Sequence, residues 1–143
     1  MTTRTAACHC GALSLECEGE PRKVSMCHCR ECQRRTGSLF SVAVFYTSDH
    51  VALPEGGFAG FTRASASGFA VTFHFCTRCG TNLWWVPVRL PMLVGVAAGC
   101  FADPDFPAPD QSVWTQDRHR WITLPEAMPC FDANPPPHRP APG

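Results

Sequence analysis

Seven of the ten cysteines of this chain fall into three short clusters with the spacing of metal ligands. The clusters read C-x-C-G, C-x-C-x-x-C and C-x-x-C-G, and their cysteines are Cys8 and Cys10, then Cys27, Cys29 and Cys32, then Cys76 and Cys79. Residues i and i+2 of an extended segment point to one side, and a following glycine permits the positive φ of a tight turn around an ion. The cysteines therefore predict metal binding.

The first and third clusters together supply four sulfur ligands. Zinc in structural sites is held by four thiolate or imidazole ligands arranged as a tetrahedron. Both pairs are followed by glycine and both lie at the ends of predicted strands, which we expect to lie side by side. We therefore predict a closed structural zinc site at Cys8, Cys10, Cys76 and Cys79 that contributes to folding.

The middle cluster supplies only three local ligands, Cys27, Cys29 and Cys32. Three protein ligands leave a fourth position on zinc for water or substrate, which is typical of a catalytic site. We favour this open site. The alternative is a second structural site completed by a distant side chain, for which the candidates are His28, His74 and Cys100.

Basic residues surround the middle cluster. Arg34 and Arg35 could capture substrate carboxylates through forked hydrogen bonds, or could equally support an anionic metal centre or lie in a solvated turn. For Arg30 we favour either support of the metal centre or a solvated turn over capture of a substrate. We expect the imidazoles of His28 and His74 to lie beside the ligands or in solvent rather than on the metal, and His28 is the better candidate for a proton shuttle.

Length and composition exclude several classes of protein. A chain of 143 residues favours one domain, and twelve basic residues balance twelve acidic ones, which gives no electrostatic reason to expect nucleic acid. We find no signal-peptide pattern, and the longest mostly apolar run, 90–102, is shorter than the roughly 20 residues of a membrane span. We expect a soluble cytoplasmic protein without a membrane partner, where cysteines favour metal over disulfides.

Short alternating segments predict a mainly β protein. The predicted strands are 12–17, 24–26, 40–46, 69–75, 82–86 and 92–96. One short helix is predicted over 30–35, and a turn of hairpin type over 54–57. Ten of the fourteen prolines lie from Pro104 onward, so we predict one zinc domain over residues 1–131 and a Pro-rich tail over 132–143.

Two further groups of residues are assigned to packing. Trp84 and Trp85 are neighbours on a predicted strand and face opposite sides, so we expect core packing for both, with one of them able to line a pocket. Cys17, Cys100 and Cys130 stand alone, and we interpret them as small apolar residues.

The ordered set of motifs resembles the glutathione-dependent formaldehyde-activating enzyme family, which also includes centromere protein V. The resemblance extends from Cys8 to about Phe131. Its segments are Cys8-x-Cys10-Gly11, Cys27-His28-Cys29-x-x-Cys32 with Gly37, Phe75-Cys76-x-x-Cys79-Gly80-Thr81, Gly99-Cys100-Phe101-x-Asp103 and the tail from Trp121 to Phe131. A single pair would be a weak signal, whereas the ordered set is highly specific. One departure is Ser112, where we would expect a histidine in many members.

The resemblance implies a β-tent fold of coiled antiparallel sheets and two zinc ions per chain. The implied structural ligands are Cys8, Cys10, Cys76 and Cys79, and the implied catalytic ligands are Cys27, Cys29 and Cys32, in agreement with the spacing. The implied reaction joins glutathione and formaldehyde into S-(hydroxymethyl)glutathione. We therefore predict a zinc-dependent carbon–sulfur lyase acting on a glutathione-like thiol and a small aldehyde. The alternative is a non-catalytic zinc-stabilised binding module or thiol carrier, and homo-oligomer formation is left open.

Overall fold

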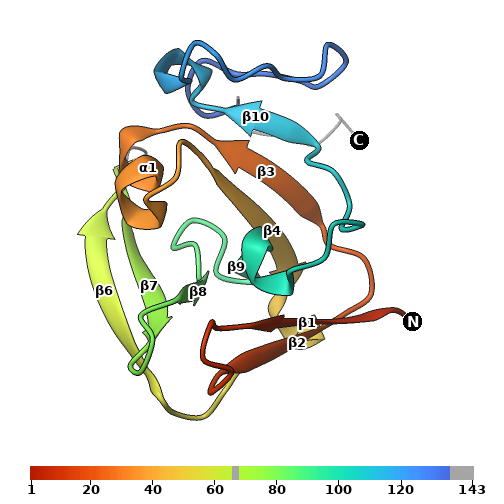
Figure 1. Ribbon diagram of the computed structural model, residues 1–143, viewed down its shortest axis with the longest axis vertical. Helices are drawn as coiled ribbons and strands as arrows, with labels where there is room; N and C mark the ends of the chain where they lie inside the picture. The colour runs from red at the N-terminus through yellow and green to blue at the C-terminus, as the bar shows by residue number, and fades with distance from the viewer. Residues whose placement is uncertain (66–67, 136–143) are drawn as a thin grey trace, which may run out of the picture.

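The computed structural model is mainly β, as predicted, and it describes residues 1–65 and 68–135 (Figure 1). The strands are β1 (Thr3–Ala7), β2 (Ser14–Glu18), β3 (Lys23–Cys27), β4 (Ser41–Thr47), β5 (Val51–Ala52), β6 (Phe58–Ala64), β7 (Ala70–Cys76), β8 (Asn82–Trp85), β9 (Leu93–Ala97) and β10 (Gln111–Val113). The helical elements are α1 (Arg30–Thr36) and three short 3-10 turns, η1 (Ser48–His50), η2 (Ala98–Phe101) and η3 (Thr115–Asp117). Within these described ranges, no helix is long and apolar enough to cross a membrane.

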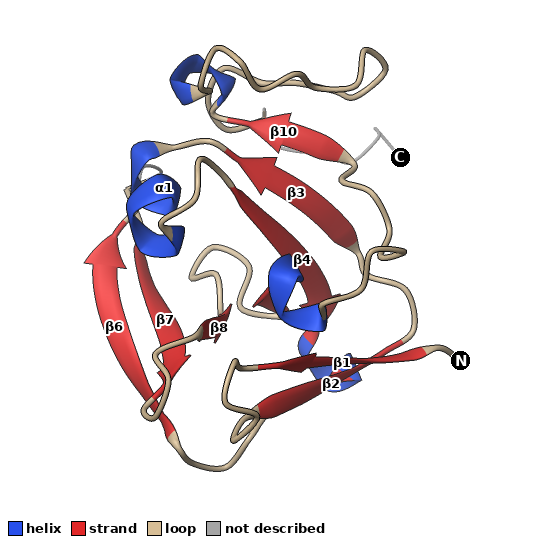
Figure 2. Cartoon of the chain, in the orientation of Figure 1, coloured by secondary structure: helices blue, strands red, loops and turns tan. Residues whose placement is uncertain are grey.

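The strands form two sheets, which Figure 2 shows meeting at an angle with α1 at one side. The smaller sheet has the order β1-β2-β5, and the larger has the order β10-β3-β4-β9-β8-β7-β6. Strand pairs are antiparallel, with the exception of β10, which runs parallel to β3. This architecture agrees with the predicted fold class.

The predicted segments recur in β2, β3, β4, β7, β8 and β9, and the predicted helix is α1. The sequence does not predict β1, β5, β6 or β10. Strand β6 contains Gly60 and the largely exposed Phe61, and so lacks a clear apolar alternation. The turn over 54–57 is not a hairpin, because it links β5 of the smaller sheet to β6 of the larger one.

The main core combines side chains of both sheets. Ala6, Leu15 and Cys17 of the smaller sheet belong to one buried cluster with residues of the larger sheet, among them Val44 and Trp84. A second, smaller cluster contains Ala43, Phe73 and Trp85. Trp84 and Trp85 are both buried and belong to different clusters, which confirms that adjacent strand residues face opposite sides here.

The C-terminal segment packs along the free edge of β10. The backbone N–H of Ser112 donates to the Pro129 carbonyl at 2.9 Å, and the Phe131 N–H donates back to the Ser112 carbonyl at 2.9 Å. Past residue 131, the Trp114 indole donates to Asn134 Oδ1 at 3.0 Å. The remainder of the predicted tail, 136–143, lies outside the described residues, and the boundary at 131 stays a prediction.

Candidate metal centres

The first and third cysteine clusters meet in space, as predicted. The Sγ atoms of Cys8, Cys10, Cys76 and Cys79 all lie within 4.8 Å of one another. The Sγ of Cys10 lies 3.7 Å from the Sγ atoms of both Cys8 and Cys76. A tetrahedral zinc ion with Zn–S bonds near 2.3 Å separates its sulfur ligands by about 3.8 Å. The spacing of the four sulfurs is therefore compatible with one shared zinc ion.

The expectation that the strands beside these pairs lie side by side is wrong. Cys8 and Cys10 follow β1 and precede β2 in the smaller sheet, whereas Cys76 ends β7 in the larger sheet. The pairs meet because the two sheets converge at this end of the fold, as Figure 1 shows. The cluster therefore joins two sheets rather than two paired strands.

Hydrogen bonds favour the thiolate form of Cys8 and Cys79 at this first centre, whereas the sulfur contacts of Cys10 help to raise its pKa to about 11. Although burial opposes ionisation of Cys8, a hydrogen bond from the Leu13 N–H, at 3.3 Å, helps to lower the pKa of the thiol. The Thr81 hydroxyl lies 3.2 Å from the sulfur of Cys79 and, with backbone N–H groups, lowers the pKa of Cys79 to about 5. The Arg78 N–H donates to the sulfur of Cys76 at 3.4 Å. Such donors are what a metal-bound thiolate needs.

The second centre is local and sits at the start of α1. Cys27 ends β3, Cys29 is the N-cap of α1, and Cys32 lies in its first turn, where its N–H donates to the Cys29 sulfur at 3.3 Å. The three Sγ atoms lie within 4.8 Å of one another, which fits a shared metal ion. Over the described ranges, no fourth histidine, cysteine or acidic side chain joins this group, so none of the three candidates, His28, His74 and Cys100, completes it.

Charge at the second centre concentrates on one sulfur. Hydrogen bonds from the Cys27 and Cys29 thiols lower the pKa of Cys32 to about 2 against the effect of burial, and the Ser41 hydroxyl and the charge of Arg35 add to the effect. The same sulfur contacts raise the pKa of Cys27. A metal ion that binds all three sulfurs would replace these shared protons.

His28 lies between two of the cysteines in sequence, but its ring is fully buried. Its Nε2 lies 2.8 Å from the Ser112 hydroxyl, at the position that departs from the family pattern. Burial, together with the charge of Arg118, lowers the pKa of His28, which favours a neutral ring. This structure leaves the ring no exposed surface for direct contact with a substrate.

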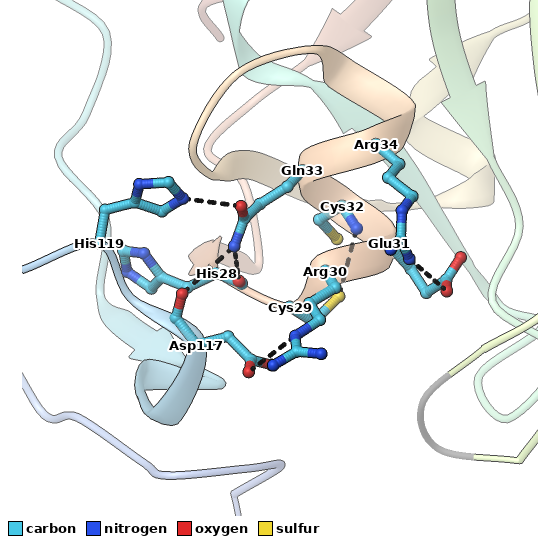
Figure 3. A network of polar contacts seen from close by, with 9 residues as sticks. All are labelled: His28, Cys29, Arg30, Glu31, Cys32, Gln33, Arg34, Asp117 and His119. Carbon is cyan, nitrogen blue, oxygen red and sulfur yellow. Dashed lines mark hydrogen bonds and ion pairs between the residues drawn. The ribbon is translucent and has the colours of Figure 1, made fainter.

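Gln33, which the sequence analysis does not single out, fastens α1 to the segment around η3 (Figure 3). Its side-chain amide donates to the His28 carbonyl at 2.8 Å and to the Asp117 carbonyl at 3.2 Å, and its Oε1 lies 2.9 Å from Nε2 of His119. Figure 3 shows this amide between the three partners. Gln33 thereby fixes the orientation of the helix that carries Cys32. A glutamine among the polar residues of a short helix gives no distinctive signal in the sequence.

The three arginines near the second centre differ in their surroundings. Arg30 and Arg34 are exposed, and each forms an ion pair, Arg30 with Asp117 at 3.7 Å and Arg34 with Glu31 at 3.7 Å. Arg35 is half-buried, and its Nη1 donates to Asn82 Oδ1 at 2.8 Å. The charge of Arg35 contributes to the lowered pKa of Cys32.

The remaining cysteines divide between the core and the surface. Cys17 is fully buried and Cys100 is half-buried, as expected for small apolar residues. The packing interpretation is wrong for Cys130, which is exposed because it lies on the outer segment along β10. All ten cysteines lie in the described ranges and none forms a disulfide.

Comparisons with known proteins agree with the motifs. A Halomonas elongata protein named "Putative glutathione-dependent formaldehyde-activating enzyme" is 27% identical in an alignment of 130 residues, and the match covers 82% of this chain and 78% of that protein. A Rhodobacter sphaeroides protein of known crystal structure superposes with a TM-score of 0.53 at 20% identity, covering 67% of this chain and 85% of that one, which supports the fold alone. The family model described as "Glutathione-dependent formaldehyde-activating enzyme" matches residues 3–117. The chain therefore belongs to the glutathione-dependent formaldehyde-activating enzyme family.

Proposed function

We propose that this chain is a zinc-dependent enzyme of carbon–sulfur lyase type that joins a glutathione-like thiol to a small aldehyde such as formaldehyde. One observation carries the proposal. Cys27, Cys29 and Cys32 form a three-sulfur group that no other candidate ligand of the described residues completes. Three protein ligands leave room for an exogenous ligand on zinc. Family membership supports glutathione and formaldehyde as the substrates.

We propose two zinc ions per chain, one at each cysteine cluster. The ion at Cys8, Cys10, Cys76 and Cys79 would be structural. At the second cluster, a bound zinc ion would favour the thiolate form of a substrate thiol. The reducing conditions of the cytoplasm, where we place the protein, would keep all these cysteines available as ligands. We keep residues 1–131 as the working unit.

The reaction is an addition that needs no oxidant or reductant. The sulfur of the thiol forms a bond to the aldehyde carbon, the carbonyl π bond breaks, and the thiol proton ends on the new hydroxyl. Arg35 holds a positive charge beside Cys32, where the anionic form of the substrate would be stabilised. Arg34 and Arg35 would bind the carboxylates of the substrate. His28, buried against Ser112, would orient the backbone that carries Cys27 and Cys29.

The decisive experiment measures the rate of S-(hydroxymethyl)glutathione formation in glutathione and formaldehyde mixtures by NMR exchange spectroscopy. The zinc-loaded protein should accelerate exchange over buffer, and the Cys29→Ser variant should lose nearly all of that acceleration. The matched control is Cys100→Ser, which removes a half-buried cysteine outside both clusters and should keep it.

Two outcomes would contradict the proposal. A Cys29→Ser variant with the rate of the unmodified protein would remove the second cluster from the reaction. An unmodified protein that binds glutathione yet leaves the exchange rate at that of buffer would indicate a thiol carrier. Elemental analysis accompanies the assay, and we expect two zinc ions per chain.

A further inference from the structure

A hollow of about 350 Å³ opens between α1 and the strands β6, β7 and β8. Its lining includes Glu31, Arg34 and Arg35 from α1, Arg63 from β6, and Phe73 from β7. The three guanidinium groups exceed the single carboxylate of Glu31, so the hollow carries excess positive charge. An excess of this kind attracts anionic ligands.

The two inner guanidinium groups are held in place by an aromatic ring. Arg35 lies over the Phe73 ring at 4.6 Å and Arg63 lies over the same ring at 4.8 Å. Both side chains are largely removed from water, with the side chain of Arg63 only 16% exposed. Two like charges on one buried ring repel each other, and a nearby anion relieves that repulsion. Their fixed orientation also reduces the entropy lost when a ligand binds.

Glu31 already acts as such an anion in the free protein. Its carboxylate lies 3.8 Å from Nη1 of Arg63 and 3.7 Å from Nη1 of Arg34. Both distances exceed those of short charge-assisted hydrogen bonds, and the Glu31 side chain is 42% exposed. A carboxylate brought by a ligand could therefore displace Glu31 and form closer contacts with the same guanidinium groups.

The hollow is connected to the second cysteine cluster through Arg35. This side chain lines the hollow and donates to Asn82 of β8, and Arg35 follows Cys32 by three residues on α1, which makes the two neighbours on the helix surface. A ligand that reaches the second centre with its thiol and carries a carboxylate a few bonds away would bring that carboxylate to this hollow.

We propose that this hollow is the carboxylate-binding subsite for the thiol substrate, with Arg63 as its specificity-determining residue and Glu31 as an internal carboxylate that the substrate displaces. The inference rests on the proposed function, because it assumes that the substrate thiol occupies the second centre. The ligand class it selects is thiols that carry a carboxylate, in preference to neutral or cationic thiols.

Isothermal titration calorimetry of the zinc-loaded protein tests the subsite with three probes. Glutathione carries both thiol and carboxylates, glutathione dimethyl ester lacks free carboxylates, and S-methylglutathione lacks the free thiol. The variants are Arg63→Gln and Glu31→Gln, and the matched control is Arg22→Gln, which removes an exposed arginine elsewhere. Arg63 packs on Phe73, so its replacement could disturb the fold. Glu31 has a partly exposed side chain, and Glu31→Gln therefore tests the subsite without disturbing that packing.

Arg63→Gln should weaken glutathione binding about tenfold, as expected for loss of a charge-assisted contact. Glu31→Gln should strengthen it roughly threefold by removing the competing carboxylate. Neither change should alter binding of the dimethyl ester, and Arg22→Gln should alter the binding of neither glutathione nor the ester. The proposed subsite would be overturned if both Arg63→Gln and Glu31→Gln left the affinity for glutathione unchanged. It would also be overturned if glutathione did not bind the unmodified protein.

S-methylglutathione separates this inference from the proposed function. If it binds the unmodified protein as tightly as glutathione and still loses affinity in Arg63→Gln, then the subsite stands and thiol binding at the second centre fails. If it binds more weakly than glutathione and Arg63→Gln changes neither affinity, the thiol site stands and the carboxylate subsite is wrong.

Discussion

The two cysteine clusters share a ligand type but differ in how the chain assembles them. The first joins Cys10 to Cys76, which are 66 positions apart in the sequence, and it connects the two sheets. The second is made within the short segment from Cys27 to Cys32, at the junction of β3 and α1. A ligand set that closes a long loop contributes more to folding than one that is already local. The first cluster is therefore suited to holding the fold, and the second to chemistry.

The second cluster would carry less negative charge than the first when each holds zinc, yet several arginines lie around it. Four thiolates and one Zn²⁺ carry about −2, whereas three thiolates and one Zn²⁺ carry about −1. Yet Arg30, Arg34 and Arg35 lie on the helix of the second cluster, and Arg63 lies close by. The four arginine charges exceed the combined charge of the cluster and of Asp117 and Glu31, the carboxylates that pair with three of them, which supports a role in binding an anionic substrate.

The largest expected difference between the clusters is in folding stability. Cys76→Ser should lower the free energy of unfolding of the zinc-loaded protein by about 4 kcal/mol or more, because it disrupts the link between the sheets. Cys32→Ser should cost less than half as much, because its partners are close in sequence. Urea denaturation followed by tryptophan fluorescence measures both. Equal losses in the two variants would refute the division of roles.

Cys17, which lies outside both clusters, should make the folding stability depend on pH. Burial raises the pKa of Cys17 to about 11 from its ordinary value near 9.0, so the folded state holds the thiol proton more tightly than the unfolded state. The contribution of the protonated Cys17 thiol to the free energy of unfolding is therefore fully present below pH 9. As the pH rises from about 9 to 11, roughly 2 kcal/mol of this contribution is lost.

The Cys17→Ala variant tests this dependence through stability curves measured between pH 8 and 11. Its stability should fall less steeply than that of the unmodified protein over this range. The exposed Cys130 serves as the control, since Cys130→Ala should reproduce the unmodified slope. Identical slopes for the Cys17 variant and the unmodified protein would contradict the assignment.

Removing the side chain that attaches α1 should have a smaller effect on stability and should weaken zinc binding at the second cluster only. Gln33→Ala removes contacts to the His28 and Asp117 carbonyls and to His119, and should reduce the free energy of unfolding by about 1–2 kcal/mol. Substitution of the exposed Gln116 by alanine is the matched control. Zinc competition with a chelator should show weaker binding at one site only, and unchanged binding at both would argue against the role of Gln33.

The smallest expected effect is at the end of the same helix. Gly37 has φ 69°, in the left-handed region, and its N–H donates to the Gln33 carbonyl at 2.8 Å. Gly37→Ala should cost about 1 kcal/mol through backbone strain, because no atom lies within 4 Å of an added Cβ. Gly37→Asn should cost less, since asparagine tolerates this conformation better. Thermal unfolding would distinguish the two, and equal losses would count against the strain argument.

Local patterns predicted much of the fold and the ligand groups. The helix over 30–35 and the strand over 40–46 recur as α1 and β4, because periodicity and a terminating glycine act within a few residues. The segment of β10, by contrast, has no strand pattern of its own. It is a strand because it pairs with β3, 86 positions earlier, as the Gln111 to Ser25 contact shows.

The sequence by itself determined which residues could bind metal, since ligand type and spacing are local properties. It also determined the split into four and three cysteines. Only the tertiary structure decided that the first cluster joins two sheets, that His28 is buried against Ser112, and that Arg63 of β6 lies beside Glu31 of α1. These contacts depend on how the sheets and α1 pack. That packing is set by burial over the whole chain rather than by any short motif.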